Sequence, residues 1–308
     1  MPRISVVIPT FNCARYLRRT IDSALCQTYT DCEIVVVDDG STDETKEIVH
    51  SYRQPIRYLY QSNAGASAAR NLALEHASGE FIAYLDADDM WHPQKLERQV
   101  AFLDTHKECG LVHSEVNVID EEDKITYERF NAETQRPVPE GYCLHDLLRR
   151  SHIQTLTVVE RRKCFDRVGL FDRRLRIAQD YLHWIMVSVE GMAVGYLPEP
   201  LGQYRWRQGS LMASQKRLFE DYVMICKILL EEKSLARRCG QDSADIVYDR
   251  LYSVQRELAY LERIEGECKS ARQRIGSLIK QRPFRAELYL DLLKALCTSV
   301  AHWTVETS

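Results

Sequence analysis

The stretch Phe81-Ile82-Ala83-Tyr84-Leu85-Asp86-Ala87-Asp88-Asp89 decides the fold of this chain. Its first five residues are a short, partly aromatic apolar run between Ser78-Gly79 and the acids, which is typical of a buried strand. Carboxylates do not stay charged in a dry core without a partner. The three acids therefore mark the end of the strand and a place where the chain binds something.

Asp86 and Asp88 lie two residues apart, so just beyond a strand both side chains can turn toward one site. Hard cations such as Mg2+ take oxygen ligands, usually one or two carboxylates together with substrate phosphates and water. The spacing therefore indicates a divalent cation, Mg2+ or Mn2+, with Asp86 and Asp88 as its ligands. The alternative is an acidic loop in which Asp89 caps the helix that Pro93 opens.

The segments before this stretch alternate between strand and helix patterns. Apolar runs predict strands at residues 4–8, 33–37 and 56–60. Helical periodicity predicts helices at residues 14–27 and 66–76. Between them a short helix is expected to run through Ile48, with Thr42 or Asp43 as its N-cap. Such alternation predicts an α/β fold with a mostly parallel central sheet flanked by helices. Ligands bind beyond the carboxyl ends of such strands, so Pro9-Thr10, Asp38-Asp39 and Asp86 to Asp88 should converge.

The second half of the chain has a looser pattern and a helical end. A strand is expected at residues 111–114, an exposed polar loop at 120–142, and short mixed elements at 144–200. From about Leu211 the pattern is helical, with a last helix after Pro283. An amphipathic stripe repeats at spacings of four and three in Val247, Leu251, Val254, Leu258 and Leu261. We expect a C-terminal helical bundle, and dimerisation or membrane-surface docking through its basic residues are the alternatives.

Composition places the chain among ordinary globular proteins. It has 308 residues and a net charge of −4, which gives no electrostatic case for binding nucleic acid. The first apolar run is too short for the core of a signal peptide, and no apolar stretch is long enough to span a membrane. The ten cysteines include no CxxC pair. We therefore expect a reduced, cytoplasmic protein.

A series of short motifs runs in order along residues 3–210. They are Ser5-Val6-Val7-Ile8-Pro9-Thr10-Phe11-Asn12, Ser23-Ala24-Leu25 with Gln27-Thr28-Tyr29, Val36-Val37-Asp38-Asp39-Gly40-Ser41-Thr42-Asp43, Asn63-Ala64-Gly65 with Ala68-Ala69-Arg70-Asn71, the stretch from Gly79 to Asp89, Gly169-Leu170-Phe171-Asp172, Gln179-Asp180-Tyr181 with Trp184, and Pro200-Leu201 with Tyr204-Arg205 and Ser210. In these residues the chain resembles family 2 of the nucleotide-sugar glycosyltransferases, which have the GT-A fold. The tail beyond Ala213 carries no motif of the family.

The resemblance implies three regions and a donor site. Residues 1–110 would be the nucleotide-sugar-binding half, 111–213 the acceptor-binding and catalytic half of the same domain, and 214–308 a helical C-terminal extension. The donor, implied to be a UDP-sugar, would be held by Pro9, Thr10, Asn12, Asp38, Asp39, Gly65 and Arg70. A carboxylate such as that of Asp39 can accept the uracil N–H, and a guanidinium suits phosphate or sugar oxygens. The alternatives are a simple turn at residues 38–41 and an ion pair of Arg70 with Glu75 or Glu80.

Asp86 and Asp88 match the DxD motif of the family, and Asp180 matches its general base. In the family the second acid of the motif ligates the metal, the first binds hydroxyls or metal-bound water, and the metal bridges the diphosphate. The base of an inverting enzyme takes the proton of the acceptor hydroxyl as that oxygen attacks the anomeric carbon. The resemblance therefore implies a metal-dependent glycosyltransferase of the hexosyltransferase type. Without that context, Asp180 would be interpreted as a helix cap.

The chain departs from the family pattern at Arg207, where many members have His. Arginine does not ligate a metal, although it can pair with phosphate. Phosphate oxygens and water would then complete the metal shell, and the metal requirement could be weaker than usual. Arg205 is either a second phosphate clamp or a buried structural charge.

Two other functions compete with the transferase. A sugar-nucleotidyltransferase would need a glycine-rich, basic loop after the first strand, and residues 9–14 contain no glycine. A non-catalytic nucleotide-sugar-binding protein would need no base such as Asp180. A nicotinamide dehydrogenase is disfavoured because no GxGxxG opens the first helix. The acceptor would be a saccharide or a lipid-linked molecule, but neither it nor the donor sugar can be identified from the residues.

Overall fold

The computed structural model describes residues 1–308 except 137, 151–152, 208–213, 232–233 and 304–308. The chain forms two compact units, Met1–Ser210 and Leu211–Ser308. All the site residues predicted from the sequence lie in the first unit, and Ser210, part of the last motif, lies outside the described residues.

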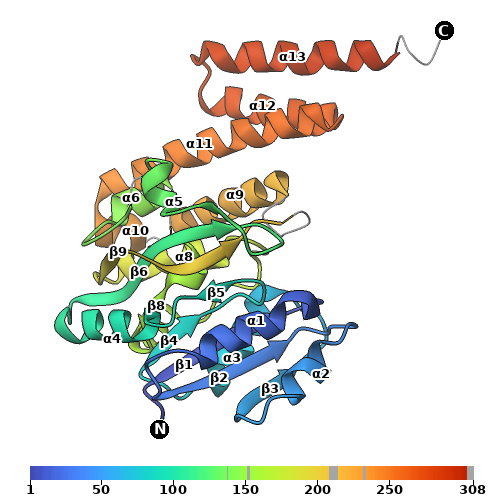
Figure 1. The fold of residues 1–308 in the computed structure, drawn as a ribbon. Coiled ribbons are helices and arrows are strands. Elements are labelled where there is room, and N and C mark those ends of the chain that lie inside the picture. The colour runs from blue at the N-terminus through green and yellow to red at the C-terminus, as the bar shows by residue number, and fades with distance from the viewer. Residues whose placement is uncertain (137, 151–152, 208–213, 232–233, 304–308) are drawn as a thin grey trace. The chain divides into compact units, whose positions relative to one another are not determined.

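The first unit begins with the four parallel strands that the apolar runs predict. They are β1 (Ile4–Thr10), β2 (Cys32–Asp38), β3 (Ile56–Tyr60) and β4 (Phe81–Tyr84), and they lie side by side in the order β3-β2-β1-β4 (Figure 1). The helices between them are α1 (Ala14–Leu25), α2 (Thr45–His50) and α3 (Ala66–His76). The expected α/β fold is confirmed, and the helix at residues 66–76 has the predicted bounds.

Beyond β4 the sheet is mixed rather than parallel. It continues through β8 (Val159–Arg161), β6 (Cys109–Ile119), β9 (Ala193–Arg205) and β5 (Met90–Trp91), with β7 (Ile125–Tyr127) beside β6. Strand β8 runs antiparallel to both β4 and β6, whereas the long strands β6 and β9 are parallel. The mostly parallel arrangement therefore holds for the N-terminal half, where each strand returns through a helix.

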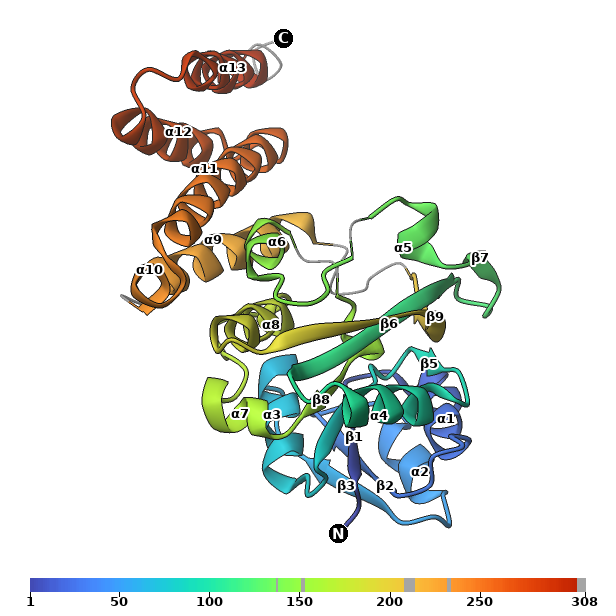
Figure 2. The same ribbon diagram turned by 90° about the vertical axis from the view of Figure 1, so that its left-hand side faces the viewer.

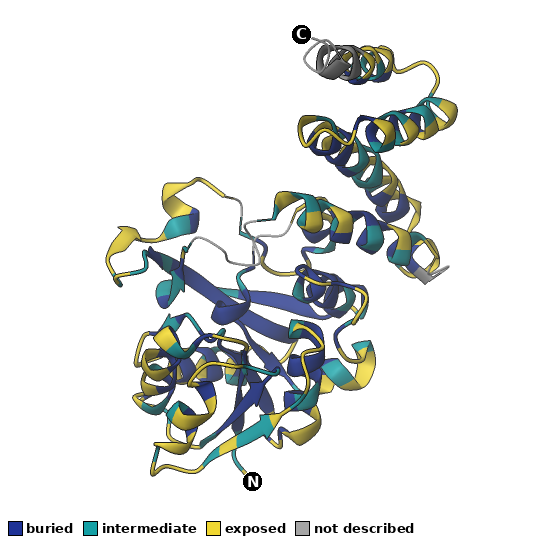
Figure 3. Ribbon diagram, turned by 90° about the vertical axis from the view of Figure 1, so that its right-hand side faces the viewer, coloured by how far each residue is buried: buried dark blue, intermediate teal, exposed yellow. Residues whose placement is uncertain are grey.

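Helices cover both faces of the parallel part (Figure 2). Alternate residues of β1, such as Val6 and Ile8, pack in one core with Leu17 of α1 and Leu96 of α4 (Lys95–Thr105). The other face carries Tyr84, which contacts Trp184 of α8 (Gln179–Val189). Figure 3 shows the resulting layers, with buried strands between helices whose outer sides are exposed. Burial of β1 and β2 on both faces explains why they are continuously apolar in sequence.

The remaining segments of the first unit are short. They are α5 (Phe130–Glu133), α6 (Leu144–Arg149), the 3-10 helix η1 (Thr155–Thr157) and α7 (Lys163–Val168). The segment expected to be an exposed polar loop is largely exposed, but β7 and α5 lie within it. Its residues Glu121 and Asp123 form ion pairs with Arg15 and Arg19 of α1. These ion pairs attach the segment to α1.

The second unit consists of helices, as expected. They are α9 (Gln215–Glu231), α10 (Ser234–Cys239), α11 (Gln241–Ile264), α12 (Cys268–Gln281) and α13 (Ala286–Trp303). The predicted stripe lies on α11, where Val247, Val254 and Leu258 are buried. In the described part of the chain, no helix combines the length and apolar character needed to cross a bilayer. The nine cysteines whose side chains are described are all free thiols.

Candidate active site

The ends of β1 and β2 meet at one edge of the sheet, as predicted. Thr10 and Asp38 are partners in the register, and the backbone N–H of Asp39 donates to the Thr10 carbonyl at 2.9 Å. The Oγ1 atom of Thr10 is buried and has no hydrogen-bond partner among the described residues. A buried hydroxyl without a partner is uncommon in folded proteins, so this edge has a polar group to offer a ligand.

Asp39 holds the loop that leads into α3. Its Oδ1 accepts hydrogen bonds from the Gln61 side chain at 2.6 Å and from the Ala64 N–H at 2.9 Å, and its Oδ2 accepts from the Gly65 N–H at 2.9 Å. Gly65 has φ of 91°, which glycine adopts without strain. A carboxylate has about four lone-pair positions, so Asp39 has room for one further donor.

Asp38 and Asn12 hold backbone turns in this structure. Both oxygens of Asp38 have partners at 2.7 Å, the Ser41 N–H and the Tyr58 hydroxyl. The side-chain oxygen of Asn12 accepts from the Thr42 N–H at 2.8 Å. For Asp38 the geometry therefore favours the turn interpretation over direct ligand contact. Asn12 and Pro9 lie at the same edge as Thr10 and are not fully buried.

Arg70 of α3 connects the acidic stretch with helix α8. Its side chain is nearly buried, and its Nη2 donates to Asp86 Oδ1 at 2.6 Å. The side-chain amide of Gln179 is oriented with its oxygen toward Arg70. In this orientation the oxygen accepts a hydrogen bond from Arg70 Nη1, and the amide nitrogen donates to the Ile177 carbonyl at 3.0 Å. Arg70 therefore pairs with Asp86, and the alternative pairing with Glu75 or Glu80 is wrong.

Asp180 lies in the first turn of α8, next to this bridge. Its Oδ1 accepts from the Tyr181 N–H at 2.7 Å, and its Oδ2 accepts from the Thr155 hydroxyl. Burial raises the pKa of the Asp180 carboxyl above its usual range, and the positive charge of Arg70 opposes that rise. A raised pKa brings a carboxylate closer to the range in which it is an effective general base.

The two predicted metal ligands each have an arginine partner. Asp86 pairs with Arg70, and Asp88 Oδ2 accepts from Arg207 Nε at 2.6 Å. Each carboxylate keeps a second oxygen, and both side chains are partly exposed. Within the described ranges no group of three or more His, Cys, Asp or Glu side chains could hold a metal alone. The residues therefore fit a cation that shares its shell with a ligand's phosphates, and they do not form a complete site by themselves.

For Arg205 the geometry favours the buried structural charge over the phosphate clamp. Its side chain is fully buried, and its guanidinium donates to the Asp88 carbonyl at 2.8 Å, to the Asp120 carbonyl at 2.6 Å and to Asp123. Its backbone N–H donates to Asp89 Oδ1 at 2.7 Å. Each of the three guanidinium nitrogens of Arg205 therefore already has an acceptor within the protein.

Asp89 consequently does not cap α4. That helix begins at Lys95, and its N-cap residue is Gln94, whose side chain makes no capping hydrogen bond. Burial, reinforced by the charges of Asp88 and Asp86, raises the pKa of Asp89 well above its usual range. Asp89 instead joins the acidic stretch to the end of β9.

Helix α3 also positions the segment that precedes α8. The side-chain amide of Asn71 exchanges two hydrogen bonds of 2.9 Å with the backbone of Phe171, and the Ser67 hydroxyl donates to the Leu175 carbonyl at 2.9 Å. Buried Glu160 of β8 accepts from the Tyr84 hydroxyl at 2.8 Å and lies 2.7 Å from His183 Nε2 of α8. These contacts tie β4, β8 and α8 together.

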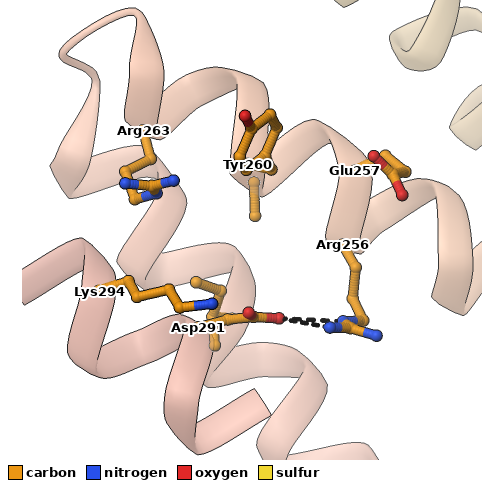
Figure 4. A pocket seen from close by; sticks show the side chains of 8 residues that line it. Arg256, Glu257, Tyr260, Arg263, Asp291 and Lys294 are labelled. Atoms are coloured by element: carbon orange, nitrogen blue, oxygen red, sulfur yellow. Dashed lines mark hydrogen bonds and ion pairs between the residues drawn. The ribbon is translucent and has the colours of Figure 1, made fainter. Parts of the chain in front are cut away.

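A pocket of about 260 Å³ lies elsewhere, among α11, α12 and α13 of the second unit (Figure 4). Its wall includes the ion pair between Arg256 and Asp291 at 2.8 Å, with Tyr260, Arg263 and Lys294 around it. None of the predicted site residues lines this pocket. The candidate active site is therefore the sheet edge in the first unit.

Comparison with known proteins shows the family of this chain. The family model described as Glycosyl transferase family 2 matches residues 5–163, which is more than half of the chain. The chain belongs to glycosyltransferase family 2. The matched segment includes β1, Asp39, Arg70 and the acids that follow β4, whereas Asp180 and Arg207 lie beyond it.

Two relatives and one solved structure show the extent of the similarity. The glycosyltransferase is 34% identical over 189 residues to an uncharacterized glycosyltransferase of Rickettsia prowazekii, a match that spans 59% of this chain and 58% of the relative. It is 30% identical over 219 residues to the Escherichia coli UDP-Glc:alpha-D-GlcNAc-diphosphoundecaprenol beta-1,3-glucosyltransferase WfaP, covering 70% of this chain and 82% of WfaP.

The solved structure extends the similarity to the fold of nearly the whole chain. Staphylococcus aureus TarS 1-349 in complex with UDP-GlcNAc has a TM-score of 0.71 and 21% identity, over 96% of this chain and 89% of that one. At this identity the likeness establishes the GT-A fold and nothing finer.

Several residues that build the site of this glycosyltransferase were not predicted as site residues. Thr155 contacts Asp180, while Gln179, Asn71 and Ser67 position the same region. Thr155 lies in no motif, so its position depended on the fold. Gln179 and Asn71 are polar residues inside quoted motifs, and a search for polar partners of Arg70 and of the loop at 169–172 could have found them.

The structural role of Arg205 predicts a large loss of stability on substitution. Arg205 is fully buried while Asp123 is partly exposed, so the loss should lie at the lower end of the about 3–5 kcal/mol that removal of one partner from a buried ion pair costs. We therefore expect Arg205→Gln to lower the free energy of unfolding by about 3 kcal/mol, measured by chemical denaturation. Arg15→Gln is the control, because its ion pair with Glu121 is exposed and should contribute less than about 1 kcal/mol. Equal stabilities of the two variants would contradict the structural role.

Proposed function

We propose that this family 2 glycosyltransferase is an inverting enzyme that moves a sugar from a UDP-sugar to a hydroxyl of a saccharide or lipid-linked acceptor. The observation that carries the proposal is the bridge made by Arg70, which brings the acids that follow β4 and the carboxylate of Asp180 to one place. The Escherichia coli relative is named for a UDP-Glc donor and a diphosphoundecaprenol acceptor, which supports this substrate class. Synthesis of a polysaccharide or glycolipid would follow from it.

The donor nucleotide would bind at the edge where β1 and β2 end. Asp39 has an unused lone-pair position for a uracil N–H, and Thr10 offers an unpaired hydroxyl. Gly65 leaves open space where a side chain would begin, which supports close approach of a ligand to the N-terminus of α3. The UDP-GlcNAc bound in the structure of TarS 1-349 supports a uridine nucleotide.

The diphosphate would lie toward Asp86 and Asp88, with a divalent cation. The free oxygens of these carboxylates would hold Mg2+ or Mn2+ together with phosphate oxygens and water. When bound, the cation supplies positive charge that stabilises the departing nucleoside diphosphate. The guanidinium of Arg70 would keep Asp86 oriented throughout.

Asp180 would be the general base. One oxygen of its carboxylate takes the proton of the acceptor hydroxyl while the acceptor oxygen forms a bond to the anomeric carbon. The bond between that carbon and the diphosphate oxygen breaks on the opposite face, and its electron pair leaves on the diphosphate, which gives inversion. Hydrogen bonds from Thr155 and the Tyr181 N–H hold the carboxylate in one orientation.

The second unit includes a surface suited to an anionic membrane. Several apolar side chains of α13 are exposed, including Leu290 at 57% and Leu293 at 56%, whereas Leu288 and Ala295 are buried. Residues 268–308 carry seven lysines and arginines against three acids, although the whole chain has a charge of −4. An amphipathic helix with basic neighbours binds anionic bilayers, so α13 would dock the enzyme beside a lipid-linked acceptor.

Asp180→Asn tests the proposed chemistry. The amide keeps the size of the side chain but does not accept a proton, so we expect transfer to fall by at least about 10^2–10^4 while UDP affinity stays unchanged. Calorimetric titration with UDP, GDP and dTDP measures binding, and nucleotide release from the matching sugar donors measures transfer. Asp146→Asn, at an exposed acid, is the control. Normal turnover of Asp180→Asn would eliminate the base, and failure of UDP to bind the wild type would eliminate the donor.

The raised pKa of Asp180 predicts the pH dependence of turnover. Only the carboxylate accepts a proton, so kcat should fall as pH decreases through that pKa, and the decline should begin above the usual range of an aspartate. Arg70 lowers this pKa, so Arg70→Gln should move the acidic limb of the kcat profile to higher pH. Arg98→Gln, on the exposed side of α4, should leave the limb in place. A limb that moves to lower pH in Arg70→Gln would contradict the assignment.

Vesicle binding tests the α13 surface. We expect the wild type to co-sediment with vesicles that contain phosphatidylglycerol and not with pure phosphatidylcholine, and we expect Leu290→Ser with Leu293→Ser to reduce that binding about tenfold. Tyr248→Ser is the control, because it removes an exposed apolar side chain from α11 instead. A wild-type dimer that the double variant converts to a monomer, without any vesicle binding, would assign the surface to dimerisation.

A further inference from the structure

Asp88 is one of the two predicted metal ligands, and the guanidinium of Arg207 already binds one of its carboxylate oxygens. The Nε of Arg207 lies 2.6 Å from Asp88 Oδ2, and both side chains are largely shielded from solvent. The guanidinium of Arg207 lies 5.8 Å from the centre of the Tyr16 ring, and that of Arg205 lies 4.6 Å from the same ring. The carboxylate that a divalent cation would use therefore already has one positive partner, Arg207, while Arg205 donates to the backbone carbonyl of the same residue.

This arrangement makes Asp88 a poor ligand for a cation that arrives alone. The metal would have to displace a guanidinium from a charge-assisted hydrogen bond, or accept a positive neighbour in a site of reduced dielectric constant. Asp86, the other predicted ligand, is also paired with an arginine, and the described residues supply no third ligand to compensate. Binding of the cation should then depend on a group that draws Arg207 away.

A diphosphate is such a group. Arginine pairs with phosphate through parallel N–H donors, and phosphate offers more acceptor oxygens than one carboxylate. The two arginines beside Tyr16 differ in their freedom to respond. Arg205 is fully buried with three acceptors on its guanidinium, whereas the Arg207 side chain is 29% exposed and pairs with Asp88.

We propose that Arg207 blocks Asp88 against divalent cations until a nucleotide diphosphate takes over the guanidinium, so that cation binding is conditional on the donor. Arg207 is then a positioning residue that acts on the cation through Asp88. The proposal rests on the proposed function for the identity of the diphosphate. The claim that Arg207 prevents a divalent cation from binding Asp88 concerns the nucleotide-free protein and does not depend on the proposed function.

Direct Mn2+ binding tests the block without any turnover. Electron paramagnetic resonance of free Mn2+ would give its affinity for the wild type and for Arg207→Gln, each with and without UDP. We expect Arg207→Gln to bind Mn2+ at least tenfold more tightly than the wild type without UDP, and we expect this difference to shrink when UDP is present. Arg207→Lys, which keeps the charge, should resemble the wild type, as should Arg15→Gln at an exposed ion pair.

The double variant Arg207→Gln with Asp88→Asn locates the effect, because the gain in Mn2+ affinity should disappear. Equal nucleotide-free affinities of the wild type and Arg207→Gln would overturn the proposal, as would a gain that persists in the double variant. Circular dichroism of each variant shows whether it is folded. If UDP fails to bind the wild type, the proposed function fails, while the comparison made without nucleotide still decides whether Arg207 blocks Asp88.

Discussion

The buried guanidinium of Arg70 is the interaction on which the candidate active site depends. A buried charge is costly unless it is paired, so Arg70 requires the acceptors it finds in Asp86 and in the side chain of Gln179. One of these follows β4 and the other begins α8. The requirement to pair one cation therefore brings Asp86 close to the start of α8, where Asp180 lies, although Asp86 and Asp180 are 94 residues apart in sequence.

Helix α3 transmits the same constraint to the rest of the site. The Gly65 N–H at its N-terminus binds Asp39, and Ser67 and Asn71 hold the segment before α8. Its small residues Ala69 and Ala73 are fully buried, which allows the helix to pack closely on the sheet. The edge at the ends of β1 and β2, the acids after β4 and the carboxylate of Asp180 are thus all positioned against one helix, which is how a site keeps its geometry.

The sequence predicted the elements of this fold well and the partners of its charged residues poorly. Periodicity located β1 to β4 and α3 because buried strands and amphipathic helices leave a local pattern, and the rule about strand ends placed Thr10 beside Asp38. The partner of Arg205 could not be predicted from the sequence. Asp123 lies 82 residues away, in a polar segment that has no periodic pattern from which its course could be inferred. The alternative ion pair of Arg70 was assigned to Glu75 or Glu80, which are close in sequence, whereas its partner in the fold is Asp86.

The negative charges of Asp86 and Asp88, after β4, are each balanced by an arginine, and this balance affects how ligands can bind. Arg70 pairs with Asp86 and Arg207 with Asp88, while burial raises the pKa of both Asp89 and Asp180. An anionic ligand that pairs with one of these arginines would break its ion pair with the aspartate. The aspartate carboxylate would then be charged and unpaired. A divalent cation would satisfy that carboxylate, so in the proposed function an anionic diphosphate and a cation would favour each other's binding at this edge. The coupling follows from the pairing of the protein's own charges, and it adds to any direct contact between the two ligands.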